Sequence, residues 1–334
     1  MTEKVVLGLS DGVDSAVAAK ILLDRGYEVH ALYLDIAGEQ GRRDAESSAE
    51  RLGIPLTVED ISGELEKHVC APFARAYLEG RTPNPCLVCN PMVKLPALLR
   101  RADAIGAKWV ATGHYAVCDG KSIYAGNPDQ DQSYMLCRLR DEQIARLLLP
   151  LGAYEKPQVR KIALELGLTV ADKPDSRENC FIKGMTYAEW IESRGEKPAE
   201  GPALLYGKEI GRHGGVHRYT VGQRWPDLIG ERRLYVSRID AAARTLELVL
   251  WEDLFRREFD ITDVNWIGGI PDAPLRASVR VRHTRWEMPM CAVTPASTGA
   301  HVVADEPFRA PATGQTAALY DGTRLLGGGF INGR

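Results

Sequence analysis

A loop of serine, glycine and aspartate residues near the N-terminus has the composition of a phosphate site. It reads Ser10-Asp-Gly-Val-Asp-Ser15 and lies between a predicted strand and a predicted helix. Free backbone N–H groups and the positive helix end favour an anion there, and the hydroxyls of Ser10 and Ser15 add donors. Asp14 is a candidate partner for a magnesium ion that neutralises phosphates. The loop lacks the Gly-Lys-Ser/Thr ending of a Walker loop, and the alternative to a phosphate site is a simple strand-to-helix turn.

Cysteines form the second group of residues with chemical potential. Cys86 and Cys89 lie three residues apart, after the Pro-stiffened segment 81–85, and Cys180 follows much later. This spacing suits shared metal ligation or redox exchange. By itself it leaves open half of a structural zinc site or two unremarkable thiols. The chain has seven cysteines, an odd number that argues against a secreted disulfide framework.

Length and composition limit the class of protein. With 334 residues the chain predicts two or three domains, and 45% hydrophobic and 26% charged residues are ordinary for a globular protein. No apolar run is long enough to span a bilayer, and the N-terminus lacks signal-peptide features, so we expect a cytoplasmic protein without membrane contact. The net charge of −3 does not favour nucleic-acid binding by the whole chain, so any basic surface must be local.

Strands and helices must alternate around the loop to position it. Apolar runs predict strands at 5–9, 28–34, 56–59 and 108–112, and helical patterns are found at 15–23, 43–52, 141–149 and 157–166. This alternation predicts an α/β fold with a doubly wound parallel sheet. Ligands bind such a sheet beyond the carboxyl ends of its strands, which is where the loop lies.

The character of the chain changes near residue 200. Short β-like stretches then follow one another between Gly, Pro and Asp turns, at 218–221, 233–238, 245–250, 277–282, 301–304 and 316–320. We therefore expect small β-rich domains or a barrel after the α/β domain. The predicted domains are 1–200, 201–262 and 263–334.

A local basic stripe is predicted in the last domain. Strand alternation puts Arg276, Arg280 and Arg282 on one face, where they are suited to phosphate contacts. The alternative is a solvated strand face, which is the commoner use of such charges.

The loop resembles the Ser-Gly-Gly-x-Asp-Ser signature of the ATP pyrophosphatase (PP-loop) superfamily. Members generally activate a carbonyl oxygen by adenylation, so the resemblance implies ATP as cosubstrate. Asp11 stands where the signature has its first glycine. Its carboxylate would face an anionic ligand unless it turns away or meets a cation.

The wider pattern resembles the tRNA-specific 2-thiouridylases over nearly the whole chain. The matching motifs, in family order, are Thr82-Pro-Asn-Pro with Cys89-Asn, Ala111-Thr-Gly-His-Tyr115, Asp131-Gln-Ser-Tyr134, Asp175-Ser, Cys180-Phe-Ile, His217 to Arg224, Arg280-Val-Arg-His283, Thr313-Gly-Gln315, Tyr320-Asp-Gly and Leu326 to Ile331. The resemblance implies ATP-dependent 2-thiolation of the wobble uridine in the anticodon region of tRNA. It also implies a cysteine desulfurase or sulfur-relay protein as donor, a PP-loop catalytic domain, a central domain and a tRNA-contacting C-terminal β-barrel.

The same resemblance assigns roles to the cysteines. Cys89 matches the catalytic nucleophile, and Cys180 matches the residue that carries the incoming persulfide sulfur, so turnover would leave a Cys89–Cys180 disulfide. Many relatives have Asp where this chain has Cys86. A third thiol has no obvious task in the persulfide scheme, and Cys86, Cys89 and Cys180 could instead hold three irons of a 4Fe-4S cluster that delivers sulfide.

Further positions are implied for the two substrates. The ATP-binding set implied by the resemblance is Gly8, Leu9, Ser10, Asp11, Gly12, Val13, Asp14, Ser15, Leu34 and Gly113. The implied tRNA-binding set is Asn84, Pro85, Cys86, Gln130, Asp131, Gln132, Arg280 and Val281. Within it, Gln132 has the donor and the acceptor that a flipped uracil edge requires.

Two other functions remain open. One is an ATP pyrophosphatase acting on a small metabolite, for which Cys89 and Cys180 would be dispensable. The other, motivated by Asp11, is a tRNA-binding paralogue with weak or no catalysis.

Overall fold

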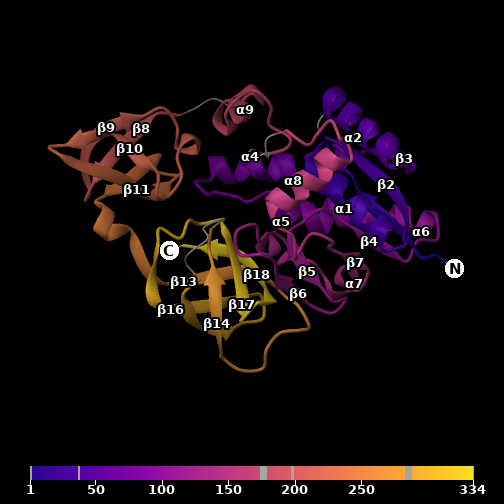
Figure 1. Cartoon of the computed structure of the whole chain (residues 1–334). Coiled ribbons are helices and arrows are strands. Elements are labelled where there is room, and N and C mark those ends of the chain that lie inside the picture. The colour runs from indigo at the N-terminus through magenta and orange to yellow at the C-terminus, as the bar shows by residue number, and fades with distance from the viewer. Residues whose placement is uncertain (1, 37, 174–178, 197–198, 283–287, 334) are drawn as a thin grey trace.

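The computed structural model describes residues 2–36, 38–173, 179–196, 199–282 and 288–333, which form three lobes (Figure 1). The motif residues Asp175 and His283 lie outside this part of the chain.

A parallel sheet forms the core of the N-terminal lobe. In spatial order its described strands are β3 (Leu56–Asp60), β2 (Glu28–Asp35), β1 (Lys4–Gly8), β4 (Trp109–Ala111) and β7 (Leu147–Leu148). Val5 and Leu7 of β1 pack into one apolar cluster and Val6 into another, so both faces of the sheet are covered. The predicted doubly wound α/β fold is confirmed.

Helices cover the two faces of this sheet. The first face is covered by α1 (Val13–Asp24), α2 (Gly38–Leu52) and α8 (Lys156–Glu165), and the second by α6 (Leu95–Ala104) and α7 (Asp141–Ile144). The other described helical segments of this lobe are α3 (Ser62–Leu65), η1 (Glu66–Cys70), α4 (Ala71–Leu78), α5 (Cys86–Cys89), η2 (Asn90–Lys94), η3 (Ser133–Leu136) and α9 (Tyr187–Ser193).

The helix predicted at 141–149 was wrong in its second half. Helix α7 ends at Ile144, and Leu147–Leu148 form the edge strand β7, paired with Val110 and Ala111. A short apolar run fits both helical and strand periods, and here the pairing with β4 decided the outcome.

The central lobe is a small β domain. Its sheet runs β10 (Arg224–Ile229), β11 (Arg232–Asp240), β12 (Thr245–Val249), β8 (Gly201–Leu205) and β9 (Lys208–His213) in the described chain. The strand predicted at 218–221 was wrong, because the 3-10 turn η4 (Val216–Arg218) occupies the start of this segment. His217 is buried there, with its Nε2 2.9 Å from Oε1 of Glu192 on α9, so the segment docks onto the first lobe instead of joining the sheet.

The last lobe is an antiparallel barrel. After η5 (Trp251–Leu254) come β13 (Phe255–Trp266), β14 (Leu275–Arg280), β15 (Met290–Pro295), β16 (Gly299–Arg309), β17 (Thr316–Asp321) and β18 (Arg324–Asn332). Pairing of β13 with both β16 and β18 closes the barrel. Because β13 begins at Phe255, the predicted domain boundary at residue 262 falls inside a strand.

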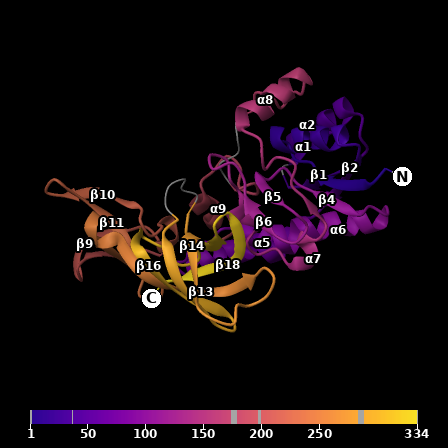
Figure 2. The ribbon, with the colours of Figure 1, turned by 60° about the horizontal axis from the view of Figure 1, so that its bottom comes forward.

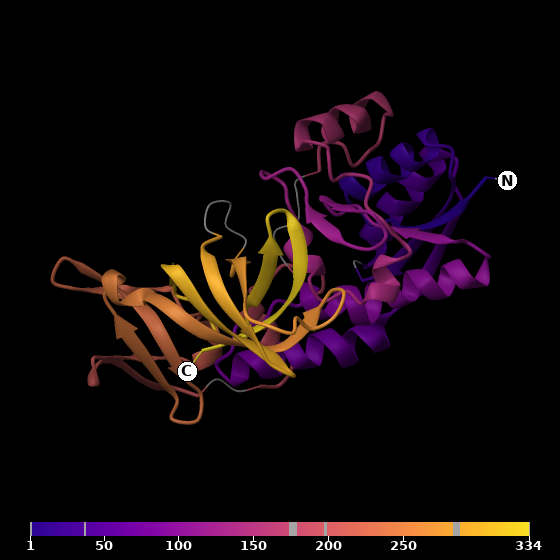
Figure 3. The same ribbon diagram turned by 90° about the horizontal axis from the view of Figure 1, so that it is seen from below.

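A hairpin of the first lobe extends the barrel sheet. Strands β5 (Ala116–Cys118) and β6 (Ile123–Ala125) pair with each other, and β6 pairs with β18. Figures 2 and 3 both show the barrel between the N-terminal and central lobes, although it is last in the chain. No helix in the described ranges is long and apolar enough to cross a membrane.

Candidate active site

The predicted phosphate loop joins the end of β1 to the start of α1, in the middle of the parallel sheet. Its two serines brace it internally: Ser10 N donates to Ser15 Oγ (3.0 Å), Gly12 N donates to Ser10 Oγ (3.2 Å), and Ser15 Oγ donates to Gly12 O (3.1 Å). These bonds fix the turn that precedes the first helical residue, Val13. The loop therefore has the shape and position expected for a phosphate cradle.

Gly113 lies directly against this loop. A Cβ atom at Gly113 would come within 2.9 Å of Ser15 N and 3.1 Å of the Asp14 carbonyl carbon. The absence of a side chain thus lets the segment after β4 approach the loop backbone. In this structure the backbone of Asp14 and Ser15 lies where a side chain at position 113 would be, so the segment after β4 packs directly against the loop.

The Asp11 carboxylate meets a cation. Lys173 Nζ lies 2.7 Å from Asp11 Oδ2, 3.0 Å from Asp11 O and 2.8 Å from Asp44 Oδ2. Burial opposes the charge of Lys173, but hydrogen bonds with Asp11 and Asp44 outweigh it and raise the lysine pKa. The carboxylate that replaces the signature glycine is therefore neutralised at the loop.

Asp14 has a different cationic partner from the magnesium ion that the sequence predicted. Lys156 Nζ lies 2.7 and 2.8 Å from the two oxygens of Asp14, and the Tyr115 hydroxyl donates to Asp14 Oδ1 at 2.6 Å. Both carboxylate oxygens are thus engaged, so this arrangement does not fit Asp14 as a magnesium ligand.

Lys156, Lys173 and Tyr115 were missed as site residues in the sequence. Tyr115 lies in the motif Ala111 to Tyr115, but a tyrosine does not by itself indicate a phosphate site. The two lysines lie far from the loop in sequence. Lys156 offered one signal, since it is the first residue of α8, where the helix dipole disfavours a cation. A lysine at that position needs a nearby carboxylate.

The short helix α5 carries Cys86 and Cys89. Asn84 Oδ1 accepts from Cys86 N (3.2 Å) and Pro85 O accepts from Cys89 N (2.9 Å), so the Pro-stiffened segment fixes the start of the helix. Cys86 is exposed and Cys89 is buried. Burial raises the pKa of the Cys89 thiol to about 11, and the Lys94 ammonium opposes this shift.

Cys180 reaches the same region through its neighbour. The Phe181 ring packs edge-on against Phe73 and Trp190, at centroid distances of 5.2 Å each, and contacts the apolar cluster that contains Cys89. After burial and Lys94, the Cys180 side chain is the next influence on the pKa of Cys89, which it raises. Cys180 therefore lies in the same region of the first lobe as Cys89 and the helix α5 that also carries Cys86.

The described residues do not form a metal-ligand set. No group of three or more His, Cys, Asp or Glu side chains among them could hold a metal ion. All seven cysteines are free thiols. The residues as arranged therefore do not fit the predicted 4Fe-4S cluster.

Predicted tRNA contacts divide into accessible and buried residues. Asn84, Pro85, Gln130 and Gln132 are partly exposed, and Asn84 and Pro85 line a cavity of about 440 Å³ between α4 and the barrel. Gln132 Oε1 accepts from Tyr115 N at 3.2 Å, so its orientation is fixed by the chain.

The predicted phosphate-binding stripe was wrong for Arg280. Its side chain is only 6% exposed and donates to Asp131 Oδ2 at 2.6 Å, and Asp131 is equally buried. Val281 is buried as well. The prediction was wrong because strand alternation shows only which residues share a face. It does not show whether that face points to solvent or to another domain.

Leu34, another implied ATP residue, is the last but one residue of β2 and packs against two apolar clusters, one of which includes Cys89. His114, in the motif after β4, has its Nδ1 2.8 Å from Thr112 Oγ1, and burial lowers its pKa to about 3. With this pKa, His114 stays neutral near pH 7 and serves in packing and hydrogen bonding.

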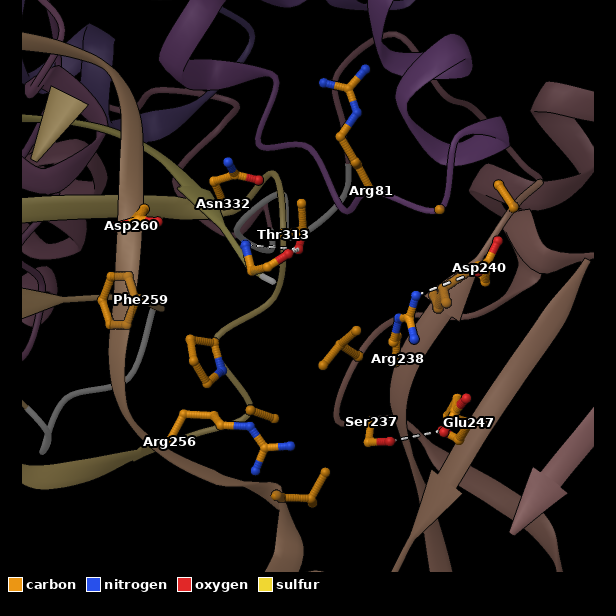
Figure 4. A pocket seen from close by; sticks show the side chains of 18 of the residues that line it. Arg81, Ser237, Arg238, Asp240, Glu247, Arg256, Phe259, Asp260, Thr313 and Asn332 are labelled. Atoms are coloured by element: carbon orange, nitrogen blue, oxygen red, sulfur yellow. Dashed lines mark hydrogen bonds and ion pairs between the residues drawn. The ribbon is translucent and has the colours of Figure 1, made fainter. Parts of the chain in front are cut away.

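A separate cavity of about 1010 Å³ lies between β11, β13 and the segment Glu79 to Arg81 (Figure 4). Carboxylates face its arginines, as where Arg238 pairs with Asp240 at 3.4 Å. Neither the loop nor the three cysteines is among its described lining residues. This cavity is therefore separate from the candidate site.

Family models cover most of the chain. The model for a tRNA methyl transferase HUP domain matches residues 3–184, that for a tRNA methyl transferase PRC-barrel domain matches 197–249, and that for an aminomethyltransferase beta-barrel domain matches 256–331.

Curated relatives match over nearly the full length. The tRNA-specific 2-thiouridylase MnmA of Syntrophotalea carbinolica is 39% identical, with 98% of each chain covered. The protein of the same name from Chloroflexus aggregans is 40% identical, again over 98% of each chain, and that of Acetivibrio thermocellus is 37% identical over 98% of this chain and 99% of its own. The chain therefore belongs to the family of the tRNA-specific 2-thiouridylases.

Proposed function

We propose that the protein is an ATP-dependent sulfurtransferase that converts the wobble uridine of tRNA to 2-thiouridine. The observation that carries the proposal is the packing of Phe181, the residue after Cys180, against the apolar cluster that contains Cys89, in the same lobe as the phosphate loop. A sulfur carrier near a second thiol, in the lobe that holds the nucleotide loop, matches a reaction that joins adenylation to sulfur transfer.

The first step would activate the base. A C2 carbonyl is a poor electrophile, so its oxygen attacks the α-phosphorus of ATP, releases pyrophosphate and becomes part of an AMP leaving group. The loop would supply backbone donors on the phosphate side, while Lys156 and Lys173 compensate the charges of the loop carboxylates. Magnesium bound with the nucleotide would neutralise phosphate charge.

The second step would transfer sulfur. The terminal sulfur of a Cys180 persulfide attacks C2, and AMP leaves with the electrons of the C–O bond. The Cys89 thiolate then attacks Sγ of Cys180, and a Cys89–Cys180 disulfide forms while the transferred sulfur keeps the electrons of the old S–S bond. A cysteine desulfurase or relay protein would reload Cys180 after a dithiol reductant opens the disulfide.

A thiolation assay tests the proposal. Unmodified tRNA with uridine at the wobble position is incubated with ATP, a persulfide donor and the protein, and 2-thiouridine is measured by mass spectrometry. We expect Cys89→Ser and Cys180→Ser to abolish product, and Cys118→Ser, a partly exposed thiol on β5, to retain it. ATP turnover by the unchanged protein that needs no tRNA and yields no 2-thiouridine would instead indicate a small-metabolite enzyme.

A rival route would form the same product through a 4Fe-4S cluster, which the described side chains as arranged do not fit. Anaerobic purification with iron and sulfide analysis separates the two. Full activity of metal-free protein with a persulfide donor excludes the cluster, and strict dependence on reconstituted iron and sulfide excludes the persulfide route. Binding of tRNA without any ATP consumption would indicate the silent paralogue.

A further inference from the structure

A buried ion pair joins the barrel to the first lobe. Arg280 on β14 donates to Asp131 Oδ2 (2.6 Å), and its guanidinium lies 4.4 Å from the centre of the Tyr134 ring. The other bonds of Asp131 come from Ser133 Oγ (2.9 Å), Ser133 N (3.1 Å) and Gly126 N (2.9 Å). A buried pair with its lone pairs satisfied in this way holds one geometry, and loss of the arginine would leave an uncompensated charge.

From this pair a chain of contacts leads to the phosphate loop. Gln132, next to Asp131, exchanges two hydrogen bonds with Tyr115: Gln132 N donates to Tyr115 O (2.8 Å), and Tyr115 N donates to Gln132 Oε1 (3.2 Å). The Tyr115 hydroxyl then donates to Asp14 Oδ1 (2.6 Å). The barrel is thus connected to the loop by three successive polar contacts, those of Arg280 with Asp131, of Gln132 with Tyr115 and of Tyr115 with Asp14.

A second set of contacts leads from the barrel to the thiols. Asn84 Nδ2, two residues before Cys86, donates to Thr316 Oγ1 of β17 at 3.0 Å. Asn90 Nδ2, next to Cys89, donates to Met135 O of η3 at 3.0 Å. The segment η3 itself is tied to the barrel, because Ser133 Oγ lies 2.8 Å from the Tyr320 hydroxyl. Both halves of the candidate site therefore rest on the same barrel face.

We infer that Arg280 is a positioning residue of the active site, which acts through Asp131 on Gln132 and Tyr115 and thereby couples the barrel to the phosphate loop. The inference rests on the proposed function, because it assumes that the loop binds ATP. On this inference the barrel does more than contact tRNA. It also holds Gln132 and the Asp14 carboxylate in one relative arrangement.

Equilibrium binding of ATP without tRNA tests this inference. Arg280→Met is expected to weaken ATP binding about tenfold, a typical size for coupling between two sites. Tyr115→Phe, further along the same chain of contacts, is expected to do the same, and the double variant should bind no worse than either single variant. Arg280→Lys keeps a charge near Asp131 and should restore affinity to within about threefold of the unchanged protein.

The control is Arg324→Met, which removes an exposed arginine of the same barrel, 3.5 Å from Asp321, and should leave ATP binding unchanged. Unchanged ATP binding by Arg280→Met overturns the inference, and so does full additivity with Tyr115→Phe. If Arg280→Met does not fold, Tyr320→Phe replaces it, with an expected loss of about threefold, and wild-type affinity then overturns the inference. Failure of the unchanged protein to bind ATP would instead refute the proposed function.

Discussion

At the scale of single residues, the unusual Asp11 is explained by its partner. A carboxylate in a phosphate loop repels its ligand unless a cation compensates it, and Lys173 does so while also contacting Asp44. The pair is about one-third exposed, so solvent screens part of its energy. Asp11 and Lys173 should therefore be treated as one unit, whose members cannot be exchanged independently.

Lys173→Met tests this unit. It leaves Asp11 and Asp44 uncompensated beside the loop, so we expect ATP affinity to fall about tenfold, measured by calorimetric titration. Asp11→Gly in the same chain should recover most of the loss. Lys161→Met, which removes an exposed lysine of α8, serves as control. If the Lys173→Met variant and the double variant Lys173→Met with Asp11→Gly lose the same ATP affinity, Lys173 does not act by compensating Asp11.

The thiol of Cys89 provides a pH-dependent prediction. Burial raises its pKa to about 11 and Lys94 opposes the shift, so Lys94→Met should raise the pKa further. Because only the thiolate reacts, alkylation of Cys89 increases as pH rises through the pKa, and the profile of Lys94→Met should lie at higher pH. At a fixed pH below the pKa, the alkylation rate of Cys89 falls about tenfold for each unit by which the pKa rises.

Peptide mass spectrometry after timed iodoacetamide labelling measures this profile. Lys121→Met, an exposed lysine of the β5–β6 turn, is the matched control. Superimposable profiles for Cys89 in the Lys94→Met variant and in the control would refute the role of Lys94.

At the scale of elements, the position of the loop follows from a close backbone contact. Gly113→Ala would place a Cβ 2.9 Å from Ser15 N, so the segment after β4 must move away from the loop at a cost of about 1–3 kcal/mol. We expect weaker ATP binding with unchanged tRNA binding, compared by titration and by filter binding. Gly63→Ala, where an added Cβ meets no heavy atom within 4 Å, should change neither. Parallel loss of both affinities would point to general unfolding.

Elements with one clear period could be predicted from sequence. Buried strands such as β1 and β2, and the Pro-started helix α8, were identified because local composition and tertiary burial agree. The edge strand β7 and the turn η4 were not, because a partner strand and a partner carboxylate decide their conformation. The same limit applies to the site: the loop and cysteines carry chemistry in their own residue types, whereas Lys156 and Lys173 acquire a role only through folding.

At the scale of the whole molecule, the barrel and the first lobe share both a sheet and a buried polar network. Their unfolding should therefore be cooperative, and Tyr320→Phe, which removes the hydroxyl bound to Ser133, should lower the stability of both by about 0.5–1.5 kcal/mol. Hydrogen exchange measured by mass spectrometry checks this: amides of β5, β6 and β17 should lose protection together, while those of β11 and β12 in the central lobe should not. Loss confined to the barrel would show that the lobes unfold separately.

The pairing of β6 with β18 also bears on how the protein is made. The hairpin 116–125 is synthesised early, whereas its partner strand, Arg324–Asn332, is the last described element of the chain. Until that strand leaves the ribosome, the hairpin has an open edge, and unpaired edges are prone to misassociation. The edge of the hairpin can thus be covered only long after residues 116–125 have been translated, so nascent chains arrested before residue 324 should expose it.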